Sequence, residues 1–398
     1  MRKSICRMNH DWRIKRLGDI CHSDLGKTLN QSKDTGKLYP YLCAVNIQWD
    51  KIDLTTLKQT RFEEDETERF SVRKGDLLVC EGGDIGRAAI WNEDEPMRYQ
   101  NALHRIRFDG SMLPRFCLYY LRSLKNQGVL DSQYGKGVTI KHLVKSSLLS
   151  IPIPVPSIKD QQHIVSELDL LTGIIDAKKK QLRDLDALAQ SIFYEMFGDS
   201  EYAHIKLAEL CASSDDIKCG PFGTQLSKDE FQKTGVAVWG IPQINSNFVV
   251  PPADYISEDK AKSLEAYSLI PGDIVMSRKG NIGQSAVFPE KFRPGVLHSD
   301  ALRIRLRSDL ANVHYYVYQF HLSPFIKHQL MLIGHGAIMP GLNVTKLKGI
   351  DVEVPPIDMQ NKFGRRVVDI EERKKEIISS ITTVKDLLDS RMDRYFTY

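Results

Sequence analysis

Apolar residues recur along two stretches of the chain at alternating spacings of four and three positions. The first stretch runs from 164 to 196 and the second from 363 to 395, in the same register. This heptad pattern predicts two long helices that pair as a coiled coil. The alternative is two helices that each lie on a globule of their own, and such helices seldom keep a strict heptad period. The predicted seam positions are Ile164, Leu168, Leu171, Ile175, Leu182, Leu185 and Ile192, then Phe363, Val367, Ile370, Ile377, Ile381, Val384 and Leu388.

Shorter patterns fill the segments that precede the two heptad stretches. Apolar runs at 77–79 and 274–276 follow a Gly-Asp pair, which predicts strands entered by a turn. LPRFCLYYLRSL (113–124) and VHYYVYQFHLSPF (313–325) predict short helices with aromatic faces. Each segment is therefore expected to form a mixed α/β globule.

These parallel patterns arise because the chain is a duplication. Three blocks recur at shifts of 197, 198 and 199 residues, in that order along the chain. The matched blocks are KGDLLVCEGGDIGRAAIW (74–91) with PGDIVMSRKGNIGQSAVF (271–288), LHRIRF (103–108) with ALRIRL (301–306), and IPIPVPSIKDQQ (151–162) with VEVPPIDMQN (352–361). Slowly growing shifts describe one long repeat with small loop insertions, which indicates duplicated domains and not solenoid units.

The repeat predicts the domain organisation. Prolines in each junction forbid a helix, and Ser157 with Asp160 has the spacing of a capping box that starts one. We expect an α+β fold in which two duplicated mixed α/β domains are separated by two long helices. The helices would form an antiparallel coiled coil and relate the domains by a near two-fold axis. The expected ranges are 1–156 and 200–356 for the domains, and 157–199 and 357–398 for the helices.

Composition adds mainly exclusions. The 398 residues carry a net charge of +4, so no strongly basic tail points to nucleic acid, although a basic face is possible. No apolar run approaches the ~20 residues that cross a bilayer. The first residues, MRKSICRMNHDW, lack the apolar stretch of a signal peptide. Seven cysteines form no C-x-x-C pair, which predicts free thiols in a reducing cytoplasm and no metal site.

The order of elements, the proline exit into a Gln-bearing helix start, and the G-D…G-x-x-G block together resemble the specificity (S) subunit of type I restriction–modification enzymes. The resemblance covers nearly the whole chain. It implies that each globule is a target recognition domain for one half of a split, asymmetric DNA site. It implies that the helices set the half-site spacing and dock two methyltransferase (M) subunits, which restriction (R) subunits join. S-adenosylmethionine, ATP and Mg would belong to those partners, and no cofactor to this chain. The longer segment 218–235 of the second copy fits two different half-site specificities.

The residues themselves carry no recognised catalytic motif. The chain has no G-x-x-x-x-G-K-[ST] loop and no D/N-P-P-Y/F stretch, and its G-x-x-G pairs are typical of tight turns. Asp273 and Lys279 resemble a nuclease pair, but Gly82 stands in the first copy where Lys279 stands in the second. A non-catalytic binding protein is therefore expected. The alternatives are a coiled-coil adaptor that binds only protein, and a recognition module of another modification-dependent defence system.

A DNA-reading protein needs cations for phosphates and planar polar groups for base edges. The glycine blocks and the loops at 134–142 and 334–343 supply such groups next to glycines. The RIR strands add arginines, for which a structural ion pair is an equal interpretation. We expect Trp91, Trp239 and Phe222 to be core or loop anchors. The candidate DNA-binding residues are Gly83, Arg87, Arg105, Lys136, Lys141, Arg278, Lys279, Asn281, Gln284, Arg303 and His335.

Overall fold

The computed structural model describes residues 12–30, 34–139, 141–198, 201–334 and 341–397. The chain divides into two compact units. The first unit contains Met1–Asp176 and Thr383–Tyr398, and the second contains Ala177–Thr382. Each unit is therefore one globule together with a part of both long helices.

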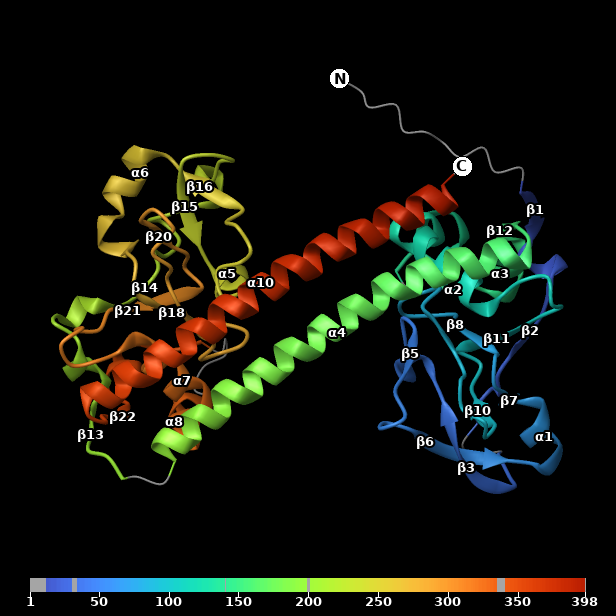
Figure 1. The fold of residues 1–398 in the computed structure, drawn as a ribbon, viewed down its shortest axis with the longest axis horizontal. Helices are drawn as coiled ribbons and strands as arrows, with labels where there is room; N and C mark the ends of the chain where they lie inside the picture. Colours follow the sequence, from blue (N-terminus) through green and yellow to red (C-terminus); the bar gives the residue numbers. More distant parts are fainter. Residues whose placement is uncertain (1–11, 31–33, 140, 199–200, 335–340, 398) are drawn as a thin grey trace. The chain divides into compact units, whose positions relative to one another are not determined.

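The first globule, residues 12–157, is built on two four-stranded sheets (Figure 1). One sheet has the antiparallel order β2 (Cys21–Leu25), β11 (Leu103–Phe108), β8 (Leu77–Cys80), β9 (Ala88–Ile90). The other has the order β6 (Lys58–Phe62), β3 (Lys37–Leu42), β10 (Met97–Tyr99), β7 (Ser71–Val72), and its central pair is parallel. A short hairpin joins β4 (Ile47–Gln48) to β5 (Lys51–Ile52).

The second globule, residues 201–356, repeats the strand order of both four-stranded sheets. Its first sheet has the order β14 (Ile217–Cys219), β21 (Ala301–Ile304), β18 (Ile274–Ser277), β19 (Ser285–Val287). Its second has the order β16 (Asp254–Ile256), β15 (Val236–Trp239), β20 (Gly295–Leu297), β17 (Ser268–Leu269), again with a parallel central pair. The duplication read from the sequence is confirmed, and so are the strands that follow the two Gly-Asp pairs.

Helices pack around these sheets. In the first globule they are α1 (Glu64–Arg69), α2 (Pro114–Asn126) and α3 (Lys145–Ser150), with a π-helical turn at Leu130–Tyr134. In the second they are α5 (Ile241–Asn245), α6 (Glu258–Ser263), α7 (Val313–Leu322), α8 (Pro324–Gly334) and α9 (Val344–Lys348). The predicted aromatic helices correspond to α2 and α7, whose tyrosines Tyr119, Tyr315 and Tyr316 are buried.

The proline junctions close each globule onto the helix that follows it. β1 (Arg13–Arg16) pairs with β12 (Pro152–Val155), and β13 (His204–Lys206) pairs with β22 (Asp351–Glu353). The helix that follows each junction carries a fully buried glutamine near its start. It is Gln161 after the first junction and Gln360 after the second. The Gln161 amide donates to the carbonyl of Pro156 at 3.0 Å, and the Gln360 amide donates to that of Pro355 at 2.8 Å. Their carbonyls accept from the backbone N of Leu113 and Asn312, beside α2 and α7. The glutamine therefore recurs because it ties three segments together.

The two long helices are α4 (Ile158–Phe197) and α10 (Ile357–Phe396), each of 40 residues. They contact each other within each unit. In the second unit Asp186 pairs with Lys374 at 2.7 Å, and the rings of Phe197 and Phe363 lie 5.5 Å apart. Rising numbers on α4 thus meet falling numbers on α10, so the helices run antiparallel. In the first unit Glu167 of α4 pairs with Arg391 of α10 at 3.0 Å. The coiled-coil prediction is confirmed.

Burial along the seam is uneven. Leu182, Leu185, Ile192 and Val384 are only half-buried, whereas the remaining predicted seam residues are buried. The cations Lys374 and Arg391 interrupt the apolar pattern, and each binds a carboxylate of the facing helix.

Buried aromatic residues outside the heptad seam attach the helix ends. Phe396 of α10 packs edge-on against Phe116 of α2, with ring centroids 5.4 Å apart. Phe193 of α4 stacks on Tyr315 of α7 at 6.0 Å. The heptad pattern did not predict these two phenylalanines, because both pack on helices of a globule. Phe193 also contacts the other long helix, since its ring lies 5.7 Å from that of Phe363 on α10. The alternative of two helices on separate globules is wrong, since α4 begins on the first globule and ends on the second.

Candidate nucleic-acid interface

In each globule the Gly-Asp pair leads into a strand, and the strand leads into a glycine-rich loop. We call residues 81–87 and 278–284 the glycine loops. Gly83 and Gly280 have φ angles of +73° and +69°, and a Cβ at either would meet nothing within 4 Å. Gly86, by contrast, lies against Leu130. The loop therefore has one glycine facing open space, where a phosphate can approach the backbone closely.

In the first globule a second loop is hydrogen-bonded to the glycine loop. The Leu143 N–H donates to the Glu81 carbonyl at 2.6 Å. Lys136 and His142 exchange two backbone hydrogen bonds of 2.9 and 2.8 Å, which close the base of a hairpin. A Cβ at Gly82 would lie 3.3 Å from Nδ1 of His142, so the two loops are in contact. Two segments predicted separately as DNA contacts thus form one surface.

The second globule repeats this connection. The Leu342 N–H donates to the Arg278 carbonyl at 3.0 Å, and Leu342 and Arg278 are the repeat equivalents of Leu143 and Glu81. Nε of Arg278 returns a bond to the Leu342 carbonyl at 3.1 Å. His335, the candidate from this second loop, lies outside the described residues.

The side chains on the two glycine loops differ in charge. The first loop carries Glu81 and Asp84 where the second carries Arg278 and Asn281. Burial raises the pKa of Glu81 above its usual range. The first copy's arginine, Arg87, donates to the Ala44 carbonyl at 2.7 Å, so its guanidinium is held inside the globule. The same scaffold thus presents an acidic loop in one copy and a basic loop in the other.

The basic loop of the second globule is partly open. Asn281 is exposed, whereas Lys279 and Gln284 are half-buried. Lys279 pairs with Asp300 at 2.6 Å. The guanidinium of Arg278 lies 4.8 Å from the ring centroid of Phe222. Phe222 is 48% exposed, so it is a loop residue that covers Arg278, as expected of an anchor. Trp91 and Trp239 are buried core residues, also as expected.

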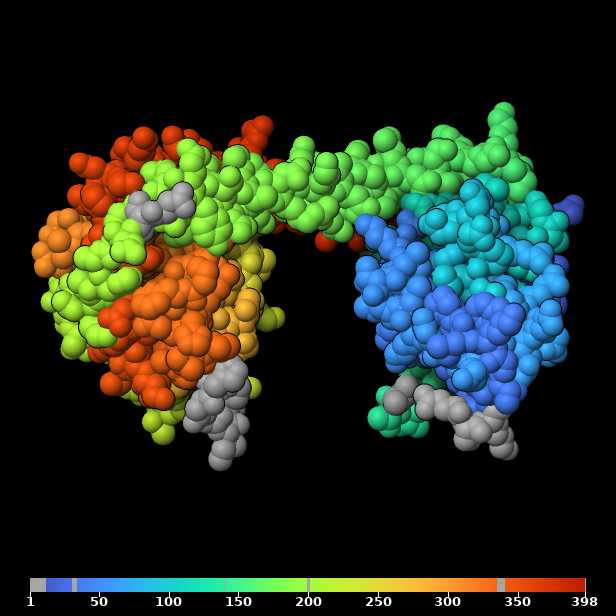
Figure 2. All heavy atoms as spheres, turned by 90° about the horizontal axis from the view of Figure 1, so that it is seen from below, coloured from blue at the N-terminus to red at the C-terminus, as the bar shows by residue number. Residues whose placement is uncertain are grey.

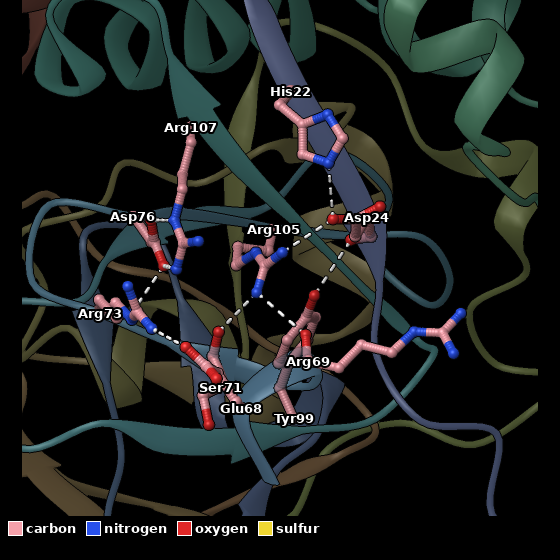
Figure 3. Close-up of polar contacts among 10 residues, drawn as sticks. All are labelled: His22, Asp24, Glu68, Arg69, Ser71, Arg73, Asp76, Tyr99, Arg105 and Arg107. Atoms are coloured by element: carbon pink, nitrogen blue, oxygen red, sulfur yellow. Dashed lines mark hydrogen bonds and ion pairs between the residues drawn. The ribbon is translucent and has the colours of Figure 1, made fainter. Parts of the chain in front are cut away.

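The arginines of the RIR strands point into the protein. Arg105 is 6% exposed; it donates to the Ser71 carbonyl at 2.7 Å and to Asp24 at 2.8 Å (Figure 3). Arg303 is 4% exposed and donates to the carbonyls of Ser268 and Asp215. Residues two apart on a strand share a face, and in these strands the second sheet covers that face. The structural interpretation therefore accounts for both side chains, and we remove them from the interface.

The acidic residue of each Gly-Asp pair is also structural. Asp76 accepts from the backbone N of Arg73 and from the guanidinium of Arg107, and Asp273 accepts from Arg305 in the same way (Figure 3 shows the first pair). Asp273 is 1% exposed and both of its oxygens are engaged. A nuclease pair of Asp273 with Lys279 is therefore excluded, because Lys279 binds Asp300 instead.

Three further findings concern metal sites, cysteines and membrane spans. Within the described ranges no cluster of three or more His, Cys, Asp or Glu side chains has the arrangement of a metal site. Cysteines 21, 43, 80, 117, 211 and 219 are free thiols. No helix in the described part of the chain is long and apolar enough to span a membrane.

The sequence of the chain matches a known protein family and several of its members. The model of the type I restriction modification DNA specificity domain matches residues 9–186 and again 200–383. The chain is 23% identical over 420 residues to the type I restriction enzyme MjaIX specificity subunit of Methanocaldococcus jannaschii, covering 98% of this chain and 94% of that protein. It is 33% identical over 153 residues to the EcoBI specificity subunit of Escherichia coli, covering 37% and 32%.

The fold agrees with a solved structure. The S subunit of a type I restriction-modification system from M. genitalium superposes with a TM-score of 0.60 at 16% identity, over 98% of this chain and 97% of that one. Together with the two domain matches, this confirms the resemblance drawn from the sequence. The chain belongs to the family of type I restriction modification DNA specificity proteins, and its role is sequence specificity and not catalysis.

Proposed function

We propose that each globule reads one half of a bipartite, asymmetric DNA site through its glycine loop and the loop bonded to it. The observation that carries the proposal is that the glycine loop, with its backbone bond to Leu143 or Leu342, is built twice with different side chains. A scaffold used twice with an acidic and a basic loop suits two unlike half-sites. The residues that we retain for DNA contact are Gly83, Lys136, Lys141, Arg278, Lys279, Asn281 and Gln284.

In this proposal the long helices set the distance between half-sites and dock two methyltransferase subunits. Residues 1–156 and 200–356 act as target recognition domains, with 157–199 and 357–398 as spacers. Methylation and cleavage then reside in methyltransferase and restriction subunits, which bring S-adenosylmethionine, ATP and Mg. The complex works in the cytoplasm, where its DNA substrate lies and where free thiols are kept reduced.

The spacer role is tested by lengthening both helices. Leu182 and Ile378 line the same cavity of about 950 Å³ in the second unit, so insertions there keep the antiparallel partners matched. Four residues added after each would lengthen the helices by ~6 Å and keep the seam nearly in phase. Mapping of methylated sites in cells that hold the variant and its methyltransferase should show the parental half-sites with a gap longer by one or two base pairs. An unchanged gap contradicts the spacer role.

A control insertion separates spacing from general damage. One residue added after each position would rotate the seam by about 100°. This variant should lose methylation altogether, because the helices no longer pair. If it methylates sites with a new gap, helix pairing is not what holds the complex.

The alternative function is a coiled-coil adaptor that binds protein alone. The two are separated by the salt dependence of binding to a duplex that contains the mapped site. A DNA reader releases counterions, so its affinity should fall steeply as salt rises. An adaptor would show no such slope. We favour the DNA reader because Lys136 and Lys141 have no carboxylate partner among the described residues.

A further inference from the structure

Val138 is the most exposed large apolar side chain in the described part of the molecule. Its exposure is 99%, and the next, Leu170 on α4, reaches 66%. It stands in the hairpin that Lys136 and His142 close. In Figure 2 the teal-green segment to which this hairpin belongs projects from the side of the first globule that faces away from α4. A valine fully in water gains no burial energy from its own chain, so its whole apolar surface is available for contact with a ligand.

The base of this hairpin is firmly held. Besides the two Lys136–His142 backbone bonds, the Leu143 N–H donates to Glu81 and the Leu143 carbonyl lies 2.7 Å from Nε2 of buried His104. Gly137, directly before Val138, has a φ of +107°, which turns the chain at the tip. Val138 therefore lies two residues from a base that is fixed by backbone hydrogen bonds.

The surroundings of Val138 are cationic. Lys136 is exposed and Lys141 half-buried, with its stem passing over Gly135. Neither ammonium group forms an ion pair with any described carboxylate. An apolar tip between two unpaired cations is complementary to a groove edged by phosphates and holding an apolar group.

We infer that Val138 is a specificity-determining residue that contacts the 5-methyl group of a thymine in the half-site read by the first globule. The inference rests on the proposed function. The thymine methyl is the apolar group on the major-groove edges of the base pairs. A wedge between stacked bases uses a longer side chain, such as Phe, Leu, Ile or Met. Val138 is short and branched at Cβ, so it suits contact with a methyl group and not insertion.

The test removes one methyl group from each side of the contact. The complex with the methyltransferase subunits is titrated with duplexes carrying the mapped site, in which each thymine of the first half-site is replaced singly by deoxyuridine. One replacement should weaken binding of the parent protein about four-fold, the effect of roughly one buried methyl group. Val138→Ala should bind the parental duplex more weakly, and the same replacement should then have almost no further effect.

Val45→Ala is the matched control, because Val45 is a 61% exposed valine of the same globule. It should retain both the parental affinity and the sensitivity to deoxyuridine. The inference is overturned if the first half-site holds no thymine, if no replacement matters, or if Val138→Ala is as sensitive as the parent. These outcomes leave the proposed function standing as long as exchange of residues 1–156 for another recognition domain changes the first half-site. If that exchange changes nothing, the proposed function fails.

Discussion

The guanidinium of Arg107 binds both carboxylate oxygens of Asp76, at 2.6 Å from Nε and 2.8 Å from Nη2. Arg305 binds Asp273 in the same two-pronged way at 2.7 and 2.8 Å. In both copies the aspartate directly precedes the strand that leads into the glycine loop. Arg107 lies on the neighbouring strand β11, and Arg305 directly follows the neighbouring strand β21. The pair therefore fixes the strand from which the glycine loop emerges. Its fork geometry makes lysine a poor replacement.

Loss of this arginine should be costly, because it leaves the buried carboxylate of Asp76 without its cationic partner. Asp76 is 3% exposed. We expect Arg107→Ala to lower the free energy of unfolding by about 3–5 kcal/mol. Arg73→Ala is the control in the same network (Figure 3), because the Arg73 guanidinium pairs with Glu68 at the surface. It should cost at most about 1 kcal/mol. Denaturant unfolding measures both, and equal costs would show that the buried pair has no special role.

Burial of His104 predicts a pH dependence of stability. Burial in β11 lowers the pKa of His104 to about 4, from 6.5. Between pH 6.5 and 4 the histidine is protonated in the unfolded chain but neutral in the folded chain. The free energy of unfolding therefore has its full value above pH 6.5 and falls as the pH falls towards 4. The contribution is about 3 kcal/mol over that window. Burial also lowers the pKa of His321 in the second globule to about 4, so both globules should weaken on acidification.

The first globule's share is measured with His104→Gln, whose amide can still donate to the Leu143 carbonyl. Unfolding between pH 7 and 4.5 should show a smaller loss of stability than in the parent. His163→Gln, at an exposed position on α4, should retain the parental slope. A parental slope in His104→Gln would mean that other groups cause the acid weakening.

The glutamine at the start of each long helix gives a third prediction. The Gln161 amide donates to the carbonyls of Ser111 and Pro156 at 2.8 and 3.0 Å, and its carbonyl accepts from Leu113 N at 2.7 Å. Gln161→Ala leaves these backbone groups unpaired, at a cost of about 3 kcal/mol. The adjacent Gln162 is exposed, so Gln162→Ala should change stability by less than about 0.5 kcal/mol. Thermal unfolding compares the two variants. Equal melting temperatures would show that the hydrogen bonds of Gln161 do not stabilise the junction.

Much of the fold could be predicted from the sequence repeat and from the spacing of apolar residues. The heptad pattern predicted both long helices, and the repeat predicted two domains with the same topology. The sequence also held an unused signal for the Arg107–Asp76 pair, since both residues recur at matching places in the second copy. Charged residues retained in both copies of a diverged repeat are more easily explained by pairing with each other than by two different DNA half-sites.

The interface was less predictable, for physical reasons. A two-residue period shows that Arg105 and Arg107 share a face, but not that a second sheet covers it. Burial of a strand face depends on contacts between distant segments, such as Arg105 with Ser71 and Asp24. The link of Leu143 to Glu81 is likewise a long-range backbone bond that no local pattern encodes. Val138 was overlooked because a lone valine in a sequence predicts burial.

The last prediction uses a pair of glycines to separate strain from DNA contact. Gly272 and Gly280 both have positive φ, +90° and +69°, and a Cβ on either would meet nothing within 4 Å. Alanine at either position should therefore cost a similar amount of stability, about 1–2 kcal/mol. Gly272 lies in the turn of the Gly-Asp pair, whereas Gly280 is the open glycine of the loop.

If a phosphate approaches the loop backbone at Gly280, only Gly280→Ala should also weaken binding to the full site. We expect a loss on the order of ten-fold, comparable to one hydrogen bond to a charged group. Gly272→Ala should bind with the parental affinity once it is folded. The measurement is a duplex titration of both variants, assembled with their methyltransferase subunits, at a temperature well below either melting point. Equal affinities would remove the second glycine loop from the DNA interface, because strain alone would then explain every effect of the substitution.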